Sequence, residues 1–433
     1  MRIHLSALGC RLNEAELEHW ASEFTRHGHK LAKLPETADV LVMNSCAVTR
    51  EAVRKSRQKI MRLKRSNPMA KIVVTGCYSE LASEDALAEL GIDLVVSNKQ
   101  KDNLVPLAQE VFGMAGMPQS ATLPAESALF ERNRQRAFIK IQDGCRYRCT
   151  FCIVTVARGD ERSRSIAHIV SEVQKLAEQN VREVVLTGVH VGGYGADLNT
   201  NLESLVCALL ADTTIDRIRF ASVEPWDLSD NFLKLFENKR LQPHMHLPLQ
   251  SGCDSVLKRM ARRCRTKDFA DLTDKLRQIN PQFNVTTDVI AGFPGETEEE
   301  WQQSLEFIAS QPFGHIHAFT FSERDGTRAA QMPNQVPGII RQRRSRELRE
   351  LAISLKETRL NREKGQTLDV LWERGASLND GQTSERRYQG YTPNYHRVFV
   401  DSHEDLTNRI LPTQILGIRD GKLHGRTLRP DPR

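Results

Sequence analysis

The sequence predicts an α/β protein with three consecutive parts: an N-terminal parallel-sheet domain, a central partial (βα)6 barrel of the TIM type, and a small C-terminal all-β barrel module. Two series of alternating strand and helix patterns predict the first two parts, because such alternation produces parallel sheets. Short strands separated by Gly and Asn turns after Lys364 predict the third part. We expect the parts at 1–112, 136–363 and 364–429, with a linker at 113–135.

The composition is that of an ordinary globular protein. The 433 residues are 39% hydrophobic and 27% charged, and their formal net charge of +6 permits a nucleic-acid partner without requiring one. Residues 1–20 carry charges throughout, and no apolar run is long enough to cross a bilayer. We therefore expect a cytoplasmic monomer without a membrane association.

The N-terminal part reads as alternating strands and helices. Asn13 is the expected N-cap of the first helix, and Glu16, three residues later, would complete a capping box. Asn67-Pro68 is the expected stop of the second helix. The expected strands are 2–8, 39–43, 71–75 and 92–96, and the expected helices are 13–27, 49–65 and 81–90.

Three cysteines follow three of these strands directly: Cys10, Cys46 and Cys77. Ligands of open α/β sheets bind outside the carboxyl ends of the parallel strands, so the three thiols should meet at one edge of the domain. The alternative is three independent core cysteines, since free cysteine is a common buried residue. The matching placement of all three disfavours that alternative.

Six further strands predict the partial barrel, whose chemistry should lie at the carboxyl ends of the strands. A long helix over 341–363 should follow, with Leu348, Leu351, Ala352 and Leu355 on one face. The expected strands are 137–142, 183–187, 217–222, 244–247, 284–290 and 315–321, with helices at 167–179, 202–210 and 298–310.

The strongest motif is the run from Cys145 through Cys149 to Cys152, just after the first barrel strand. Three thiolates at this spacing can hold three corners of a cubane cluster and leave the fourth iron open. A zinc site would need a fourth protein ligand or a catalytic water, and no Cys or His pair lies nearby to close it. An odd total of nine cysteines also disfavours a disulfide framework.

The other three cysteines have no motif. Cys207 lies among leucines and valines and is expected in the core, whereas Cys253 and Cys264 fall in a helical region. We expect none of them to bind metal.

The Cys145–Cys152 motif, with the aromatic Phe151 before its last cysteine, resembles the signature of the radical S-adenosylmethionine superfamily. The resemblance implies a 4Fe–4S cluster whose open iron binds S-adenosylmethionine and whose one-electron reduction yields a deoxyadenosyl radical. It also implies cofactor contacts from the Gly-rich loop 187–195 and from strand ends, although ordinary turn chemistry explains each residue equally well. The candidates are Gly188, Glu224, Gln250 and Asp288.

The N-terminal trio, the motif and the terminal module together resemble the methylthiotransferase family over essentially the whole chain. The resemblance implies a second 4Fe–4S cluster on Cys10, Cys46 and Cys77 that supplies the sulfur, and an electron donor such as flavodoxin or ferredoxin. No catalytic residue is assigned beyond the cluster ligands. The segment 390–395 resembles the RNA-binding TRAM module. Aromatic rings in and beside it should stack on unpaired bases, with core packing as the alternative: Tyr388, Tyr391, Tyr395 and His396.

Within that family the chain looks most like the bacterial tRNA threonylcarbamoyladenosine branch, through residues 55–58, 186–194, 217–219 and 390–395. The implied reaction adds a methylthio group to C2 of N6-threonylcarbamoyladenosine in the tRNA anticodon stem-loop. The alternatives are isopentenyladenosine in tRNA, whose branch usually has Gly-Gln-Asn at 188–190, and an aspartate of a ribosomal protein. A non-catalytic RNA-binding iron–sulfur protein is the alternative of another class.

Runs of basic residues support a polyanionic partner. Residues 54–65 hold seven Lys or Arg and no acid, and residues 258–267 hold six. A single run usually marks a solvated helix face, but several runs in one chain raise the odds of a nucleic-acid surface.

Overall fold

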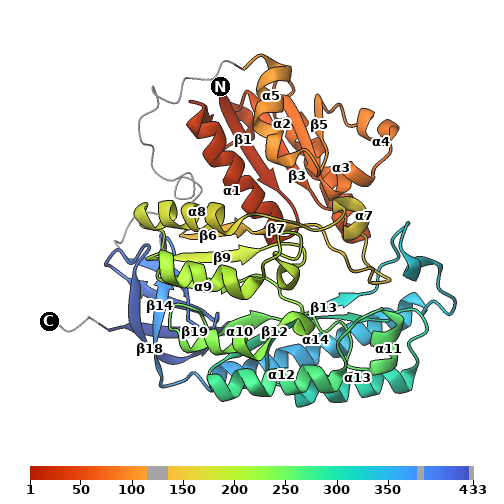
Figure 1. The fold of residues 1–433 in the computed structure, drawn as a ribbon, viewed down its shortest axis with the longest axis vertical. Helices are drawn as coiled ribbons and strands as arrows, with labels where there is room; N and C mark the ends of the chain where they lie inside the picture. Colours follow the sequence, from red (N-terminus) through yellow and green to blue (C-terminus); the bar gives the residue numbers. More distant parts are fainter. Residues whose placement is uncertain (115–134, 378–384, 429–433) are drawn as a thin grey trace.

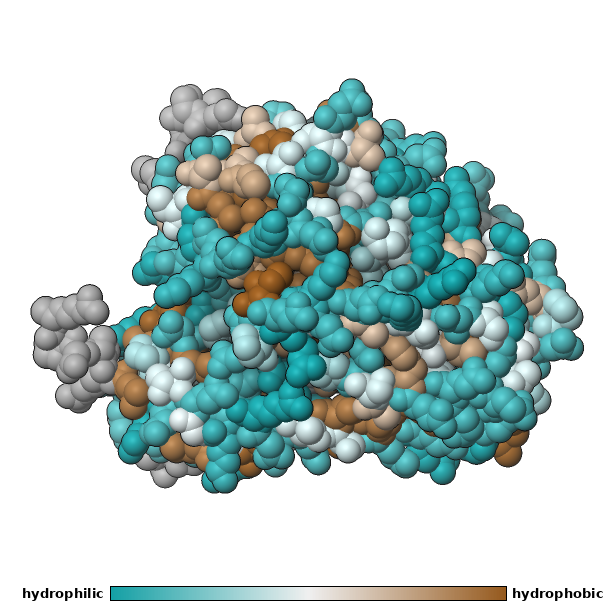
Figure 2. All heavy atoms as spheres, turned by 60° about the horizontal axis from the view of Figure 1, so that its bottom comes forward, coloured by the Kyte–Doolittle hydropathy of each residue, from teal (hydrophilic) through white to brown (hydrophobic). Residues whose placement is uncertain are grey.

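The computed structural model describes residues 1–114, 135–377 and 385–428, so most of the expected linker at 113–135 lies outside the described residues. The chain forms an N-terminal α/β domain above a partial barrel, with a β module at one end of that barrel (Figure 1). The predicted fold class is therefore confirmed. Hydrophilic residues cover most of the face in Figure 2, and hydrophobic ones gather in a band near its centre.

The N-terminal domain is a five-stranded parallel sheet in the order β2-β1-β3-β4-β5. Helices cover both faces, so the central strand β3 is buried along its whole length. The strands are β1 Arg2–Ala7, β2 Lys30–Leu31, β3 Val40–Ser45, β4 Lys71–Gly76 and β5 Leu94–Val96. The helices are α1 Arg11–Arg26, α2 Arg50–Ser66, α3 Cys77–Leu81, α4 Glu84–Ala88 and α5 Leu104–Phe112.

Three predictions for this domain are wrong or incomplete. Helix α1 begins at Arg11 with Cys10 as its N-cap, so Asn13 and Glu16 form no capping box. Both residues lie within the helical segment, and their side chains are buried. The expected helix at 81–90 is broken into α3 and α4, because the Ser83 hydroxyl caps a new helix. The sequence reading also missed β2 and α5.

The partial barrel has six parallel strands in two sheets, β6-β9-β10 and β11-β12-β13, connected by one bridge between Ile218 and Leu241. The strands are β6 Arg136–Lys140, β9 Glu183–Thr187, β10 Arg217–Phe220, β11 His244–His246, β12 Asn284–Ala291 and β13 Phe313–Thr320. Helices α8 Ile166–Glu178, α9 Leu202–Asp212, α12 Thr266–Ile279 and α13 Glu298–Ser310 form the outer layer. The predicted partial barrel is confirmed.

Two helices complete this layer from outside the regular series. The long helix α14 Gly338–Asn361 lies along β13, with Leu348 and Ala352 buried in the barrel core. Helix α1 of the N-terminal domain lies against β6, where Ala15 contacts Phe138 and Val185 on the inner face of the strands. The N-terminal domain thus packs directly on the barrel interior.

The C-terminal module is a six-stranded sheet whose strands β14, β18, β19, β17 and β16 close into a barrel, because β14 pairs with both β16 and β18, while β15 pairs only with β16. The strands are β14 Thr367–Trp372, β15 Ala376–Ser377, β16 Arg386–Tyr391, β17 Arg397–Ser402, β18 Ile410–Arg419 and β19 Lys422–Thr427. The turn after β16 covers the amino ends of the central strands: Arg219 donates to the Pro393 carbonyl at 2.9 Å, and Asn284 donates to the Asn394 carbonyl at 2.8 Å.

The expected stacking surface for bases is wrong for the rings named. Tyr388, Tyr391 and His396 are buried. The Tyr395 ring stacks on Tyr391 at 4.9 Å and contacts His244 at 4.6 Å, and the Arg219 guanidinium lies 4.6 Å from its centroid. Tyr388, Tyr391 and His396 pack inside the protein and are not available to RNA, whereas the partly buried Tyr395 closes the charged floor of the central barrel.

Candidate active site: two cysteine trios joined by buried charges

The first trio lies at the carboxyl edge of the N-terminal sheet, as its strand-end placement predicts. Cys10 caps α1, Cys46 follows β3 and Cys77 begins α3. The pKa of Cys46 is raised to about 11, mainly by desolvation and also by the neighbouring Cys10 and Cys77, against a backbone hydrogen bond from Val48. The three sulfurs therefore lie within electrostatic reach of one another.

A glycine brings two of these cysteines together. Gly9 has a φ of +114°, and a Cβ there would lie 2.8 Å from the Cys46 sulfur. Any side chain at this position would push into the trio. Three thiols at one edge of the sheet, with no fourth ligand identified within the described residues, fit a cluster with one open iron.

The second trio lies on the loop after β7 Gln142–Asp143. Desolvation raises the pKa of Cys145 to about 12, and Glu224, Cys152 and Cys149 act in the same direction. The Arg262 guanidinium lies 3.9 Å from the Cys149 sulfur. The donor set again fits a three-thiolate cluster, and binding of a cluster would release the thiol protons.

A buried histidine fixes the Gly-rich loop beside the second trio, and the sequence reading missed its role. His190 Nε2 lies 2.6 Å from Asp227 Oδ2, and its Nδ1 contacts Glu161. Burial opposes protonation, but the Asp227 and Glu161 carboxylates raise the pKa of His190. The Tyr147 hydroxyl donates to Asp227 at 3.2 Å, so this group of side chains ties the loop after β9 to the cysteine motif.

Three of the four expected cofactor contacts follow the carboxyl ends of barrel strands, and the fourth, Asp288, lies within β12. Gly188 follows β9, and a Cβ there would lie 2.9 Å from the Gln142 side-chain oxygen. Glu224 follows β10, and its buried Oε2 has no hydrogen-bond partner among the described residues. The Gln250 backbone forms an isolated parallel β-bridge with Val289, and the Asp288 carboxylate lies 3.2 Å from His246 Nε2. Glu224 Oε2 lies 3.7 Å from His190 Nε2 as an ion pair and can still accept a hydrogen bond from a polar ligand, while the cofactor contacts themselves stay predictions.

The inner faces of β11, β12 and β13 carry a group that sequence reasoning did not find. The possible ligand atoms of His246, Asp288 and His317 lie within 4.8 Å of one another. Strand alternation explains the placement, because Met245, Val289 and Ile316 face the outer core. Arg11 lies across from them, with its guanidinium 5.1 Å from the Phe138 ring centroid.

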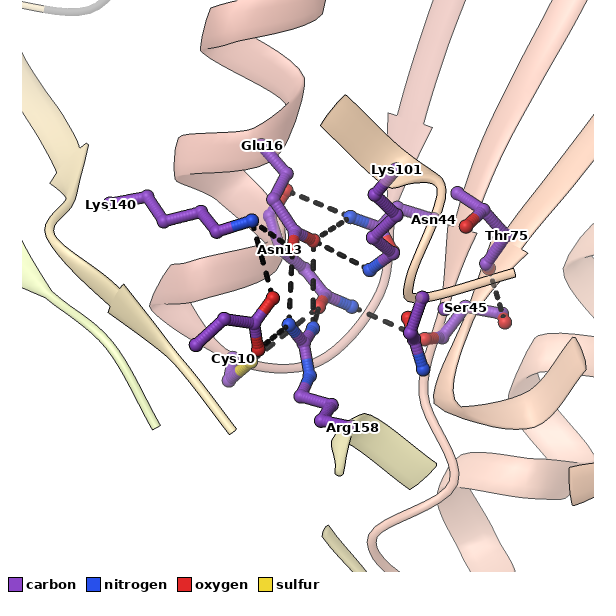
Figure 3. Close-up of polar contacts among 12 residues, drawn as sticks. Cys10, Asn13, Glu16, Asn44, Ser45, Thr75, Lys101, Lys140 and Arg158 are labelled. Atoms are coloured by element: carbon purple, nitrogen blue, oxygen red, sulfur yellow. Dashed lines mark hydrogen bonds and ion pairs between the residues drawn. The ribbon is translucent and has the colours of Figure 1, made fainter. Parts of the chain in front are cut away.

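Buried charges connect the two trios (Figure 3). Arg158, at the end of α7 Val154–Arg158, donates to Glu16 at 3.0 Å, to Asp143 at 2.9 Å and to Asn13 at 2.8 Å. Lys101 donates to Glu16 at 2.7 Å. We call these buried charges the Arg158 network; its members are Arg158, Glu16, Asp143, Lys101 and Lys140. The Arg158 network therefore ties the helix after Cys10 to the segment that flanks the second trio.

A basic groove of about 510 Å³ runs along α2 toward the end of β13. Four of its lining residues are arginines: Arg50, Arg54, Arg57 and Arg324. The basic run seen in the sequence thus forms one wall of a groove. Ser56 of α2 donates to the Cys46 carbonyl at 2.8 Å, which places the helix that lines the groove beside the first trio.

The remaining cysteines are at other places. Cys207 is exposed, so its predicted core position is wrong: Leu205, Val206 and Leu209 face the barrel, and the helical period turns Cys207 outward. Cys253 and Cys264 are buried.

Among the described residues, no helix has the length and apolar character needed to span a membrane.

Known proteins resemble the chain over nearly its full length. Residues 2–97 match the model of the uncharacterized protein family UPF0004, and residues 139–308 match the radical SAM superfamily. A threonylcarbamoyladenosine tRNA methylthiotransferase, MtaB, of Bacillus subtilis is 35% identical over 94% of this chain and 92% of its own. A tRNA-2-methylthio-N(6)-dimethylallyladenosine synthase of Akkermansia muciniphila is 31% identical over 96% of both chains.

The solved structures show the same fold at low identity. The radical S-adenosylmethionine methyltransferase TsrM from Kitasatospora setae matches with a TM-score of 0.55 and 14% identity. The match covers 73% of this chain and 72% of TsrM.

Proposed function

The chain belongs to the tRNA methylthiotransferases of the radical S-adenosylmethionine superfamily, and from this premise we propose that it methylthiolates C2 of N6-threonylcarbamoyladenosine beside the tRNA anticodon. The observation that carries the proposal is the pair of three-cysteine sites, one in each domain, joined through Arg158. A sulfur-carrying site and a radical-generating site must act on one base, so a fixed mutual position is what this chemistry needs.

The residues around the two sites have separable roles in this proposal. Cys145, Cys149 and Cys152 hold the 4Fe–4S cluster that reduces S-adenosylmethionine, and Cys10, Cys46 and Cys77 hold a second cluster that supplies the sulfur. His190, Asp227 and Glu161 keep the Gly-rich loop against the second trio. Gly188, Glu224, Gln250 and Asp288 bind S-adenosylmethionine. A flavodoxin or ferredoxin as electron donor and a monomeric state belong to the same proposal.

The inner face of the barrel supports the threonylcarbamoyl substrate. The threonyl part of that group ends in a carboxylate, whereas an isopentenyl group is apolar. No ion pair or hydrogen bond with another described residue engages the Arg11 guanidinium, and its charge reaches His317 and Tyr395 on the inner wall. A substrate carboxylate would satisfy this cation, whereas an isopentenyl group would only cover it.

Replacing Arg11 with alanine tests the substrate class. We expect kcat/KM for tRNA bearing N6-threonylcarbamoyladenosine to fall roughly 10- to 100-fold, since a charge-assisted hydrogen bond contributes about 1.5–3 kcal/mol. The measurement is competition between that tRNA and one bearing isopentenyladenosine, with each product quantified by mass spectrometry. Arg26→Ala, at the exposed far end of α1, is the matched control. A parent enzyme that prefers isopentenyladenosine contradicts the proposal.

The groove along α2 offers a surface for the tRNA backbone. The Arg54 and Arg57 side chains reach only exposed carboxylates, Glu51 and Glu89, which phosphates can replace. We expect Arg54→Gln/Arg57→Gln to weaken tRNA binding and to reduce the slope of log K against log salt by roughly 1.4–1.8, for two lost phosphate contacts.

The control for the groove is Arg182→Gln, which removes an exposed arginine at the amino end of β9, outside the groove. Filter binding at several salt concentrations measures both variants. An unchanged slope in the Arg54/Arg57 variant would show that the groove does not bind tRNA phosphates.

A further inference from the structure

We propose that Arg158 and Glu16 act as positioning residues that set, with opposite signs, the reduction potential of the cluster on Cys10, Cys46 and Cys77. This inference rests on the proposed two-cluster enzyme. Reduction adds one negative charge to a cluster. A fixed cation nearby therefore favours the reduced form, and a fixed anion disfavours it.

The Arg158 network holds its charges away from water. The exposed fractions of the Arg158 and Glu16 side chains are 1% and 2%, and that of Asp143 is 3%. Arg158 Nη1 alone donates to carboxylates on α1 and on β7, and Lys101 and Lys140 add two cations. The low local dielectric strengthens the effect of each charge on a neighbouring redox centre.

One amide connects this network to the first trio. Asn13 Oδ1 accepts a hydrogen bond from Arg158 Nη2 at 2.8 Å, and the Cys10 thiol donates to the same oxygen at 3.6 Å. Arg158 therefore lies one side chain away from a cluster ligand. The Asn13 amide nitrogen donates to the Leu8 carbonyl at 2.7 Å, which prevents the amide from turning.

Arg158 and Glu16 place opposite charges at one point beside the first trio, 3.0 Å apart. The carboxylate of Glu16 is ionised at neutral pH, because Arg158, Lys101 and Lys140 hold its pKa far below the usual range against the cost of burial. The cation and the anion therefore bias an added electron on the cluster in opposite senses.

The network also differs from a simple structural brace. Its five charged groups comprise three cations and two carboxylates, and Lys140 also pairs with the exposed Asp102 at 3.2 Å. Asp143 lies two residues before Cys145 in the sequence and accepts a hydrogen bond from Arg158 at 2.9 Å. The Arg158 cation, which Asn13 links to Cys10, favours cluster reduction and makes the sulfur-carrying site accept an electron more readily.

The test isolates the first site by placing alanine at Cys145, Cys149 and Cys152 in the full-length, iron-reconstituted protein. Dithionite titration followed by electron paramagnetic resonance then measures its midpoint potential. We expect Arg158→Met to lower the equilibrium constant for reduction at least tenfold, which is 59 mV for one electron. Glu16→Gln should raise it by a similar factor, while Arg158→Lys and the exposed Arg26→Met should stay near the parent value.

The opposite signs distinguish electrostatics from disruption, because Arg158→Met and Glu16→Gln break the same hydrogen bond. Shifts in the same direction, or none in Glu16→Gln, overturn the inference. If Arg158→Met does not fold, a positive shift in Glu16→Gln with an unchanged Arg158→Lys supports it. An isolated site without about four irons per chain overturns the two-cluster function as well, whereas a loaded site with unshifted potentials overturns the inference alone.

Discussion

Alanine at Cys10, Cys46 and Cys77 should leave an enzyme that consumes S-adenosylmethionine but makes no methylthio product. We expect product formation to fall below detection, because the sulfur then has no binding site. Deoxyadenosine release under reducing conditions should continue, since Cys145, Cys149 and Cys152 follow a barrel strand and keep their own supports, including Tyr147 and Arg262. Chromatography of deoxyadenosine and nucleoside mass spectrometry measure the two outcomes on one sample.

The reciprocal variant is the control for this experiment. Alanine at Cys145, Cys149 and Cys152 should keep about four irons on the N-terminal trio and release no deoxyadenosine. Methylthio product at the parent rate from the N-terminal variant would rule out the sulfur-carrying role. Loss of all iron from the reciprocal variant would show that the N-terminal trio holds no cluster of its own.

Removal of the C-terminal module should destabilise the whole catalytic barrel. The module supplies hydrogen-bond acceptors for buried arginines at the amino ends of the catalytic barrel's strands. Arg217 donates to the Asp369 carbonyl at 2.9 Å, and Arg219 donates to the Pro393 carbonyl at 2.9 Å. Without the module, Arg136 loses its ion pair with Glu373 at 3.1 Å, and the neighbouring Glu183 becomes exposed to solvent. Each buried polar group left without a partner costs about 1–3 kcal/mol, so a chain ending at Asn361 should lose most of its stability.

A single substitution tests the same contact without deleting the module. Tyr395→Ala removes the ring between Tyr391, His244 and Arg219, and we expect it to lower the free energy of unfolding by about 2–4 kcal/mol. Arg387→Ala breaks only the exposed pair with Asp401 and should cost less than about 1 kcal/mol. Denaturant unfolding measures both. A truncated chain as stable as the full one would show that the module is an independent attachment.

The sequence was sufficient for the fold class because the relevant patterns are local. The alternation of strands and helices and the stop of the second helix at Asn67-Pro68 are properties of a few neighbouring residues, and the structure agrees with them. The cysteine placement was equally readable, since Cys10, Cys46 and Cys77 each follow a strand whose direction fixes where its end lies.

The features that the sequence did not predict depend on distant partners. Asn13 and Glu16 form a good local capping pattern, but Arg158, more than a hundred residues later, recruits both into a buried network. Tyr391 and Tyr395 have the composition of a base-stacking surface, yet the barrel floor covers them. The sequence neighbours of Cys207 are apolar, and only the helical positions of the buried ones among them show that Cys207 faces outward.

Mass spectrometry of tRNA nucleosides, from cells with and without this gene, tests the proposed reaction most directly. The function proposed here predicts that 2-methylthio-N6-threonylcarbamoyladenosine is present with the gene and absent without it, with a matching rise in N6-threonylcarbamoyladenosine. The gene carrying alanine at Cys10, Cys46 and Cys77 should not restore the product. Loss of 2-methylthio-isopentenyladenosine instead, or an unchanged nucleoside profile, would contradict the assignment.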